Sequence, residues 1–439
     1  MPPSPPSPPT VVTDALLVTQ DAGRRVLRGD LRFEGGRITH VGPGAPREGA
    51  EVVDGRGTVA VPGFINAHAH AANALLRGIA DDLPFPKFLE TVFAVDARRT
   101  EADVEAGARA GVAEMLLGGT TSFLDLFYFE DAVARATVGL GMRGFLGWAV
   151  LDPDKTTQTG VPLDNARAFV GRWKGHPLVT PLVAPQGVYA CGRETWLAAK
   201  ELAERTGTLL HYHLSETRGE VHEHERATGL RPAAWLESIG FLGPGQVAAH
   251  AVWLTGAEIG TLARHAVAVA HCPSSNLKLA SGGVAPVVEL RAAGATVALG
   301  TDSVVTNNSL SMFREMHVAG LVQKNQRWDP AVLTAQELLD LATLGGARAL
   351  GRADDLGSLE VGKRADVFLA RLDHPSLVPA RPDAVVSHLA YSASEEAVDT
   401  VFVDGRAVVR GRRLLGGDWT RIRSEAEAAA ESLWASRPR

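Results

Sequence analysis

The stretch Phe64–His70, FINAHAH, ends an apolar run with two histidines that are one residue apart. Side chains alternate between the two faces of a β-strand, so we expect His68 and His70 on the same face. Two imidazoles on one face can bind the same metal ion. A pair of hydrogen-bonded core histidines explains this motif equally well when it is taken alone. The residues that end other apolar runs therefore decide between the two interpretations.

Phe64–His70 is the first of eight short apolar runs that alternate with amphipathic helical segments. This alternation is typical of a parallel sheet in which a helix follows each strand. The runs that we predict as strands are 64–70, 120–127, 143–149, 178–185, 208–213, 246–250, 266–271 and 296–302. The count predicts an α/β fold with a (β/α)8 TIM barrel, whose active site lies at the carboxyl ends of the strands. A doubly wound open sheet is the structural alternative.

Both ends of the chain have a different pattern, with apolar and polar residues alternating between glycines. This pattern predicts short strands and hairpins. We expect one small β-sandwich domain built from residues 11–62 and 356–420, with the barrel between them at 63–355. Residues 1–10, MPPSPPSPPT, are proline-rich and predict a disordered tail. Residues 421–439 predict a C-terminal helix.

The composition excludes several functional classes. The formal net charge is −6, and the basic residues are scattered, so we expect no nucleic-acid binding. No apolar run approaches the ~20 residues that cross a membrane. The N-terminus lacks the features of a signal peptide, and two cysteines are too few for a disulfide framework. We expect a cytoplasmic protein whose partner is a small-molecule substrate, and leave a homo-oligomer open.

Titratable residues end several of the predicted strands, which favours a metal site over core packing. Strand 5 ends in HYHLSE, strand 6 in QVAAH, strand 7 in AVAH and strand 8 in ALGTD. The predicted ligands are three imidazoles and one carboxylate: His68, His70, His213 and Asp302. This donor set suits Zn(II), with Fe(II) as the alternative. Strand 4, LVTPLVAP, offers no lysine or glutamate to bridge a second ion, so we predict one divalent metal.

Three of the residues near these strand ends are predicted to be catalytic. A bound ion would lower the pKa of its water, and Glu216 is placed to carry the proton to the substrate. His250 would orient the nucleophile, and Asp302 would share its proton while binding the ion. His211 precedes His213 by two residues and should point inward one layer deeper, in a hydrogen-bonded packing role.

Five segments of the chain together resemble a known family: VPGFINAHAHAANALLRGIADDLPF, HYHLSET, AAHAVWLT, AHCPSSNLKLASGGVAPV and GTDSVVTNNSLSMFREM. They are similar to the amidohydrolase superfamily, in particular to its methylthioadenosine/S-adenosylhomocysteine deaminase-like branch. The likeness runs from about residue 12 to about residue 420. It implies a barrel with a small β domain, zinc at the four ligands named above, and hydrolytic loss of ammonia from an aminated heteroaromatic ring.

The resemblance also implies substrate contacts, and here the chain departs from the family pattern. Gln186 stands where relatives acting on adenosine-type compounds carry a histidine, and Trp148 where an arginine often meets a substrate carboxylate. Asp96 replaces a longer glutamate expected to hold ribose hydroxyls, and Ser303 replaces a glycine. We expect these four residues, with Glu216 and His250, to bind the substrate. Without the arginine, a substrate less charged than S-adenosylhomocysteine is preferred, because a desolvated carboxylate would lack its partner.

Three functions remain open from the sequence. The first is a metal-dependent hydrolytic deaminase that converts an adenosine-type nucleoside or another aminopurine-like ring to its oxo form. The second is a hydrolase on the same scaffold that displaces chloride or an alkylamine from a triazine, or opens a cyclic amide. The third is a non-catalytic binding or scaffold protein, which would have no physical need for the full ligand set and Glu216.

Overall fold

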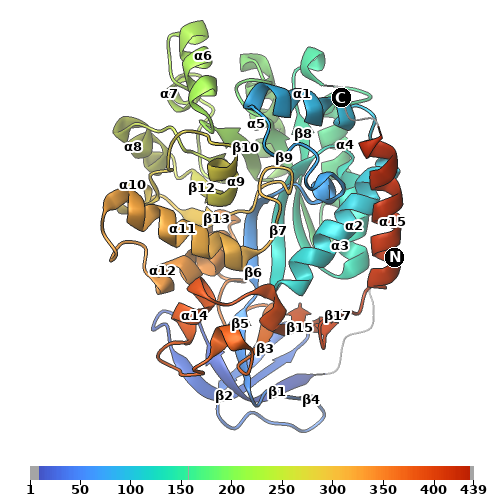
Figure 1. Ribbon diagram of the computed structural model, residues 1–439, viewed down its shortest axis with the longest axis vertical. Helices are drawn as coiled ribbons and strands as arrows, with labels where there is room; N and C mark the ends of the chain where they lie inside the picture. The colour runs from blue at the N-terminus through green and yellow to red at the C-terminus, as the bar shows by residue number, and fades with distance from the viewer. Residues whose placement is uncertain (1–8, 157, 436–439) are drawn as a thin grey trace.

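The computed structural model describes residues 9–156 and 158–435. The predicted disordered tail, residues 1–10, lies outside this part of the chain except for its last two residues, and Thr10 already begins a strand. The chain forms a barrel of parallel strands surrounded by helices, with a separate β-sheet below it (Figure 1). The exact boundaries of the two domains stay a prediction.

Eight parallel strands form the barrel, each hydrogen-bonded to the next in chain order. They are β6 (Phe64–Ala69), β7 (Thr120–Phe127), β8 (Arg143–Val150), β9 (Val179–Pro185), β10 (Leu210–Leu214), β11 (Gln246–His250), β12 (Ala268–His271) and β13 (Val297–Leu299). The ring closes just beyond β13, where the amide of Asp302 donates to the carbonyl of His68 at 2.9 Å. The predicted barrel is therefore confirmed, and the open doubly wound sheet is excluded.

The barrel strands are apolar along their length because both of their faces are buried. Inward side chains such as Ile65, Leu124 and Phe145 fill the interior, while outward ones such as Phe123 and Leu146 pack beneath the helices. The surrounding helices are α1 (Phe85–Asp96), α2 (Glu101–Leu117), α3 (Glu130–Leu140), α4 (Pro162–Trp173), α5 (Arg193–Thr206), α6 (Arg218–Thr228), α7 (Pro232–Ser238), α8 (Gly256–Arg264), α9 (Pro273–Lys278), α10 (Val287–Ala292), α11 (Met312–Arg327), α12 (Ala335–Asp340), α13 (Gly346–Ala349) and α14 (Val385–Tyr391).

The segment directly after β6 is held against helix α2. This segment forms the short 3-10 helix η1 (Ala71–Leu76), and two glycines of α2 let it approach closely. A Cβ atom at Gly107 would lie 2.1 Å from the carbonyl oxygen of Ala72, and one at Gly111 2.4 Å from that of Ala71. A larger residue at either position would push η1 away, so these glycines help to position the end of β6.

Both ends of the chain form the second sheet, as the sequence predicts. Its strands are β1 (Thr10–Val18), β2 (Val26–Glu34), β3 (Arg37–Gly42), β4 (Glu51–Asp54), β5 (Thr58–Pro62), β14 (Val367–Arg371), β15 (Val398–Val403), β16 (Arg406–Arg410) and β17 (Arg413–Leu414). Hydrogen bonds join all nine into one sheet, in which β14, β5 and β1 separate β15 from β2. Phe33 of β2 nevertheless meets Phe402 of β15, with ring centroids 5.0 Å apart. The sheet therefore curls over its own apolar core, in the manner of a sandwich.

The C-terminal helix α15 (Trp419–Trp434) returns to the barrel and lies along α2 (Figure 1). Near its end, the indole nitrogen of Trp434 donates to the carbonyl of Leu75 at 2.9 Å. The helix thereby braces the segment that follows His68 and His70. Over residues 9–156 and 158–435, no helix is long and apolar enough to cross a membrane.

A buried ion-pair network joins the barrel to the small domain. Arg143 begins β8, and its guanidinium donates to both carboxylate oxygens of Asp366 at 3.1 Å and to Asp404 at 2.7 Å. Only 2% of the Arg143 side chain is exposed. The two aspartates belong to the small domain, so this network connects elements that are far apart in the sequence.

Replacing Arg143 with alanine is expected to lower the free energy of unfolding by about 3–5 kcal/mol, because buried carboxylates would lose their counter-charge. Denaturant unfolding followed by circular dichroism measures this loss. Arg381→Ala, which removes an exposed ion pair with Asp383, is the matched control and should cost less than about 0.5 kcal/mol. Equal losses in the two variants would show that the network contributes no more than a surface pair.

Candidate active site

Residues from four strand ends meet at the carboxyl end of the barrel. His68 lies in β6 and His70 directly follows it, His213 lies in β10 and His250 in β11, and Asp302 follows β13. Their ligand atoms form two overlapping groups, His68–His70–His213 and His68–His250–Asp302, within each of which all atoms lie within 4.8 Å of one another. All five residues are buried. The structure therefore brings the four predicted metal ligands together with His250.

Backbone carbonyls orient two of the histidine rings. The Nδ1 atom of His70 lies 2.6 Å from the carbonyl oxygen of Leu126, and that of His213 lies 2.8 Å from the carbonyl oxygen of Gln186. A carbonyl oxygen only accepts hydrogen bonds, so Nδ1 carries the proton in both rings. When each ring is neutral, the lone pair on Nε2 is then free, as a metal ligand requires.

His68 is oriented by a second histidine. Its Nδ1 lies 2.8 Å from Nε2 of His211, and Nδ1 of His211 lies 2.8 Å from the carbonyl oxygen of Val247. The carbonyl places a proton on Nδ1 of His211, so Nε2 of His211 accepts from Nδ1 of His68. The hydrogen-bonded role expected for His211 thus orients a predicted ligand. Within the described residues, the buried Nε2 of His68 has no hydrogen-bond partner, as expected of an atom that faces a cation.

Asp302 turns one carboxylate oxygen toward the histidines. Its Oδ1 lies 3.3 Å from Nε2 of both His68 and His70. Its Oδ2 accepts from the hydroxyl of Thr306 at 3.0 Å and from that of Ser275. Burial alone would raise the pKa of Asp302, but the contacts with His68 and His70 hold it well below its usual range. The carboxylate is therefore ionised and available to a cation.

Several residues of this centre have a left-handed backbone, with φ of +59° at Asp302, +72° at His250 and +49° at Ser215. This region is costly for residues other than glycine, and such strain concentrates at functional sites. The surrounding barrel holds these residues in place.

The protonation of the three predicted histidine ligands suits metal binding. Burial lowers the pKa of His68 and His213 well below the ordinary value, so both rings are neutral at neutral pH. Burial also opposes the charged form of His70, but the Asp302 carboxylate raises the pKa of this ring above its ordinary value. A cation bound at Nε2 of His70 would take the place of that proton. The donors present therefore fit a divalent ion.

Glu216 lies beside this centre, two residues beyond β10. Its Oε2 is 3.7 Å from Nε2 of His250, and 15% of its side chain is exposed. Burial, together with the charge of Asp302, raises the pKa of Glu216 from 4.5 to about 8. The amide of Asn276 donates to Nδ1 of His250 at 3.1 Å, which leaves the proton of the neutral ring on Nε2. A carboxyl group and an N–H donor thus face the same space.

Glu220 is a member of the site that the sequence analysis missed. Its carboxylate accepts from the amides of Ser215 at 3.0 Å and Glu216 at 2.8 Å, which fixes the loop that carries Glu216. Burial, with the nearby Glu216 charge, raises the pKa of Glu220 to about 7. The signal was present in the sequence, because Thr217 and Glu220 have the spacing of a helix-capping pair. Thr217 does accept from the Glu220 amide at the start of α6.

Two of the predicted substrate contacts, Gln186 and Ser303, follow the ends of barrel strands. Gln186 follows β9, and its side-chain amide donates to the hydroxyl of Tyr189 at 3.3 Å. The hydroxyl of Ser303 already accepts from the side chain of Asn73 at 2.9 Å and from the amide of Val305 at 3.1 Å. Ser303 therefore organises the turn after Asp302.

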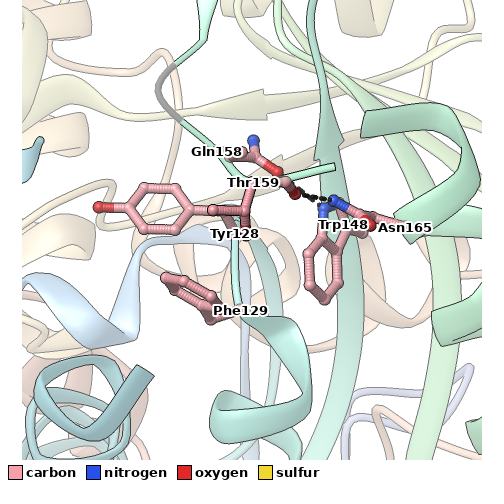
Figure 2. A pocket seen from close by; sticks show the side chains of 6 residues that line it. All are labelled: Tyr128, Phe129, Trp148, Gln158, Thr159 and Asn165. Atoms are coloured by element: carbon pink, nitrogen blue, oxygen red, sulfur yellow. Dashed lines mark hydrogen bonds between the residues drawn. The ribbon is translucent and has the colours of Figure 1, made fainter. Parts of the chain in front are cut away.

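Trp148 lies apart from the candidate metal centre. It packs against Phe169 of α4, on the helix side of the sheet, and its indole nitrogen donates to Gln158 at 2.9 Å. Figure 2 shows the small pocket that it lines with Tyr128, Gln158 and Asn165. The structure does not bring Trp148 together with the five clustered residues. Asp96 ends α1 and has an arginine neighbour, Arg99, that the sequence analysis did not single out.

Known proteins resemble this chain over nearly its whole length. The model of the amidohydrolase family matches residues 59–408. A 5-methylthioadenosine/S-adenosylhomocysteine deaminase of Desulforudis audaxviator is 41% identical over 92% of this chain and 95% of its own. A 5'-deoxyadenosine deaminase of Methanothermobacter thermautotrophicus is 40% identical over 94% of this chain and 96% of its own.

Solved structures show the same likeness. An adenosine deaminase from Xanthomonas campestris with bound zinc has a TM-score of 0.93 at 32% identity, covering 97% of this chain and 98% of its own. An atrazine chlorohydrolase from Arthrobacter aurescens complexed with zinc has a TM-score of 0.87 at 26% identity, over 96% of this chain and 100% of its own. The family match and the identity to curated relatives agree with the barrel and its strand-end residues: this chain belongs to the amidohydrolase family.

Proposed function

We propose that this protein is a hydrolytic deaminase that converts the amino group of an adenosine-type nucleoside to an oxo group and releases ammonia. The observation that carries the proposal is the convergence of three oriented imidazoles and an ionised carboxylate beside the buried carboxyl group of Glu216. Relatives that are about 40% identical carry deaminase names, which supports the choice of reaction.

The proposed cofactor is one Zn(II), held by His68, His70, His213 and Asp302. The free Nε2 atoms and Oδ1 of Asp302 suit the borderline-soft character of zinc, and the zinc-bound relatives support it over iron. When bound, such an ion supplies a Lewis acid that activates water as a nucleophile. The carbonyls of Leu126, Gln186 and Val247 keep the rings in the tautomer that can bind it, the last of them through His211.

Proton transfer is the proposed role of Glu216. Its carboxylate takes a proton from the attacking water and delivers it to a ring nitrogen. It then passes the remaining proton of the added hydroxyl to the amino group, so that the C–N bond breaks, ammonia leaves and the oxo group forms. One water is consumed and one ammonia is released, so the substrate changes only from amino to oxo. The raised pKa of Glu216 lets the side chain both accept and donate a proton near neutral pH.

His250 acts next to Glu216 in this proposal. With Asn276 bound to Nδ1, its Nε2–H donates to the oxygen that develops negative charge on the attacked carbon. Asp302, while it binds the ion, shares the proton that Glu216 transfers. Asp96, Gln186 and Ser303 remain proposed substrate contacts, of which Ser303 acts through the turn after Asp302. Trp148 would have to act from the separate pocket that it lines with Tyr128. We also infer that the protein works in the cytoplasm, consistent with Cys191 and Cys272, which are buried and free.

A screen in ¹⁸O-labelled water tests the reaction. We expect ammonia release from adenosine or its 5'-modified analogues, with one labelled oxygen in the product, and little release from aminopyrimidines or pterins. Triazines that carry chloride or alkylamine groups belong in the same screen, because the fold is shared with an atrazine chlorohydrolase. Chloride or alkylamine release without deamination would establish the alternative hydrolase, and a product with an opened ring would establish cyclic amide hydrolysis.

A further inference from the structure

Arg99 is a buried cation whose hydrogen-bonding capacity is only partly used. Its side chain is 0% exposed. Nη1 donates to the side-chain oxygen of Asn73 at 2.9 Å and lies 3.5 Å from Oδ1 of Asp96. The guanidinium also lies over the ring of Phe127, 5.1 Å from its centroid. Its Nε and Nη2 atoms are buried without a partner among residues 9–156 and 158–435.

These contacts place Arg99 beside the metal centre. The ring of Phe127 under the guanidinium is 6.3 Å from the ring of His70. Asn73, which accepts from Arg99, donates in turn to Ser303, the residue after Asp302. Arg99 therefore contacts groups at the ends of β6 and β7, and the hydrogen bonds of Asn73 link it to the turn after β13.

Tyr128 lies next to Arg99 and Asp96. Its hydroxyl donates to the backbone carbonyl of Asp96 at 3.2 Å. Burial raises the pKa of Tyr128, and the Asp96 carboxylate raises it further, whereas Arg99 lowers it. The phenol thus stays protonated and lies close to both charged side chains. Tyr128 also lines the pocket shown in Figure 2.

Stability alone does not explain an arginine at this position. A buried guanidinium with unused donors is costly, and an apolar residue of similar length would avoid that cost. Asp96, in contrast, keeps 21% of its side chain exposed and does not depend on Arg99 for solvation. What Arg99 does provide is a counter-charge for the Asp96 carboxylate, with Nη1 at 3.5 Å from Oδ1. The pair is neutral overall, which suits an uncharged ligand rich in hydroxyl groups better than an anion.

We infer that Arg99 is a positioning residue that sets the specificity for the sugar hydroxyls of the substrate by orienting the Asp96 carboxylate that accepts them. The inference rests on the proposed function and adds a residue and a selectivity to it. It also offers a physical reason why an aspartate suffices here: the arginine behind it restricts the short carboxylate to one orientation, with Asn73 and Phe127 holding the arginine.

The test compares adenosine with 2',3'-dideoxyadenosine, which lacks the two hydroxyls, in the wild type and in Arg99→Met. For adenosine we expect KM to rise about 10- to 100-fold, as for a lost hydrogen bond to a charged group, with kcat nearly unchanged. For the dideoxy compound we expect kcat/KM to change less than about threefold, since the contact is absent there. Thermal unfolding should show an unchanged or higher Tm, which a structural role for the arginine would not allow.

Two further variants keep the result interpretable. Arg98→Met removes the same charge from the adjacent, exposed residue and should leave both substrates unaffected. Arg99→Lys keeps the buried charge but lacks the planar set of N–H donors of a guanidinium. This variant should show a smaller KM rise for adenosine, and it replaces Arg99→Met in the test if that variant fails to fold. If Arg99→Met loses the same factor in kcat/KM on both substrates, or leaves the KM for adenosine unchanged, the inference is overturned while the proposed deamination stands. A wild type that deaminates neither compound would instead refute the proposed function.

Discussion

Glu216→Gln is expected to lower kcat by about 10²- to 10⁴-fold, the range for loss of a general acid–base group. Glutamine has nearly the same shape as glutamate, but it cannot take up a proton from water and pass it to the substrate ring. Glu216 is 3.7 Å from His250 and is not one of the predicted metal ligands, so the ion should remain in place. Steady-state kinetics with adenosine and metal analysis of the purified variant measure the two quantities together.

The control for this prediction is Glu223→Gln, an exposed glutamate on α6, the helix that follows Glu216. It removes the same charge at a short distance in sequence, and its kcat should equal that of the wild type. Turnover within about threefold of the wild type in Glu216→Gln would remove Glu216 from the mechanism. A loss of metal along with activity would show that its carboxylate helps to hold the ion.

Removing the metal is expected to abolish turnover and to destabilise the fold. Without an ion, the buried centre contains free imidazole nitrogens next to a buried carboxylate, which is an unfavourable arrangement in the interior. If the free ion is present at about 1,000 times its Kd, binding contributes about 4 kcal/mol to the free energy of unfolding. Dialysis against a chelator, followed by thermal unfolding and assay, measures both losses, and added Zn(II) should reverse them.

His213→Ala separates the ion from other effects of the chelator. This variant should bind metal weakly and resemble the chelated wild type, because Nε2 of His213 is one of the predicted ligands. His222→Ala, at an exposed position of α6, should retain metal, activity and stability. A wild type whose activity and Tm do not respond to chelation would favour the non-catalytic scaffold instead.

Local patterns in the sequence were sufficient to predict most of the fold. The eight apolar runs match β6–β13 closely, because a strand buried on both faces is apolar along its whole length. The histidines at 68 and 70 share a face because side chains alternate on a strand, and Asp302 follows the last strand of the ring. The convergence of the predicted ligands then follows from barrel closure, which brings the ends of the first and eighth strands together.

Other features depended on contacts that no local pattern reveals. The curled sheet joins Phe33 to Phe402 across residues distant in sequence, and Arg143 of the barrel meets Asp366 and Asp404 of the small domain. The position of Trp148 on the helix side was also unforeseen, although Trp148 lies within β8 and shares the outward face of Leu146.

The sequence by itself thus determined the type of fold, the predicted donor set for a metal ion and the presence of a titratable carboxyl group at Glu216, because these depend on residue type and on the period of a strand. Only the tertiary structure decided which nitrogen of each histidine is free, that Glu220 fixes the Glu216 loop, and that Arg99 stands behind Asp96. Hydrogen-bond partners and burial are set by packing between distant segments, and the tautomer and pKa of a side chain follow from them.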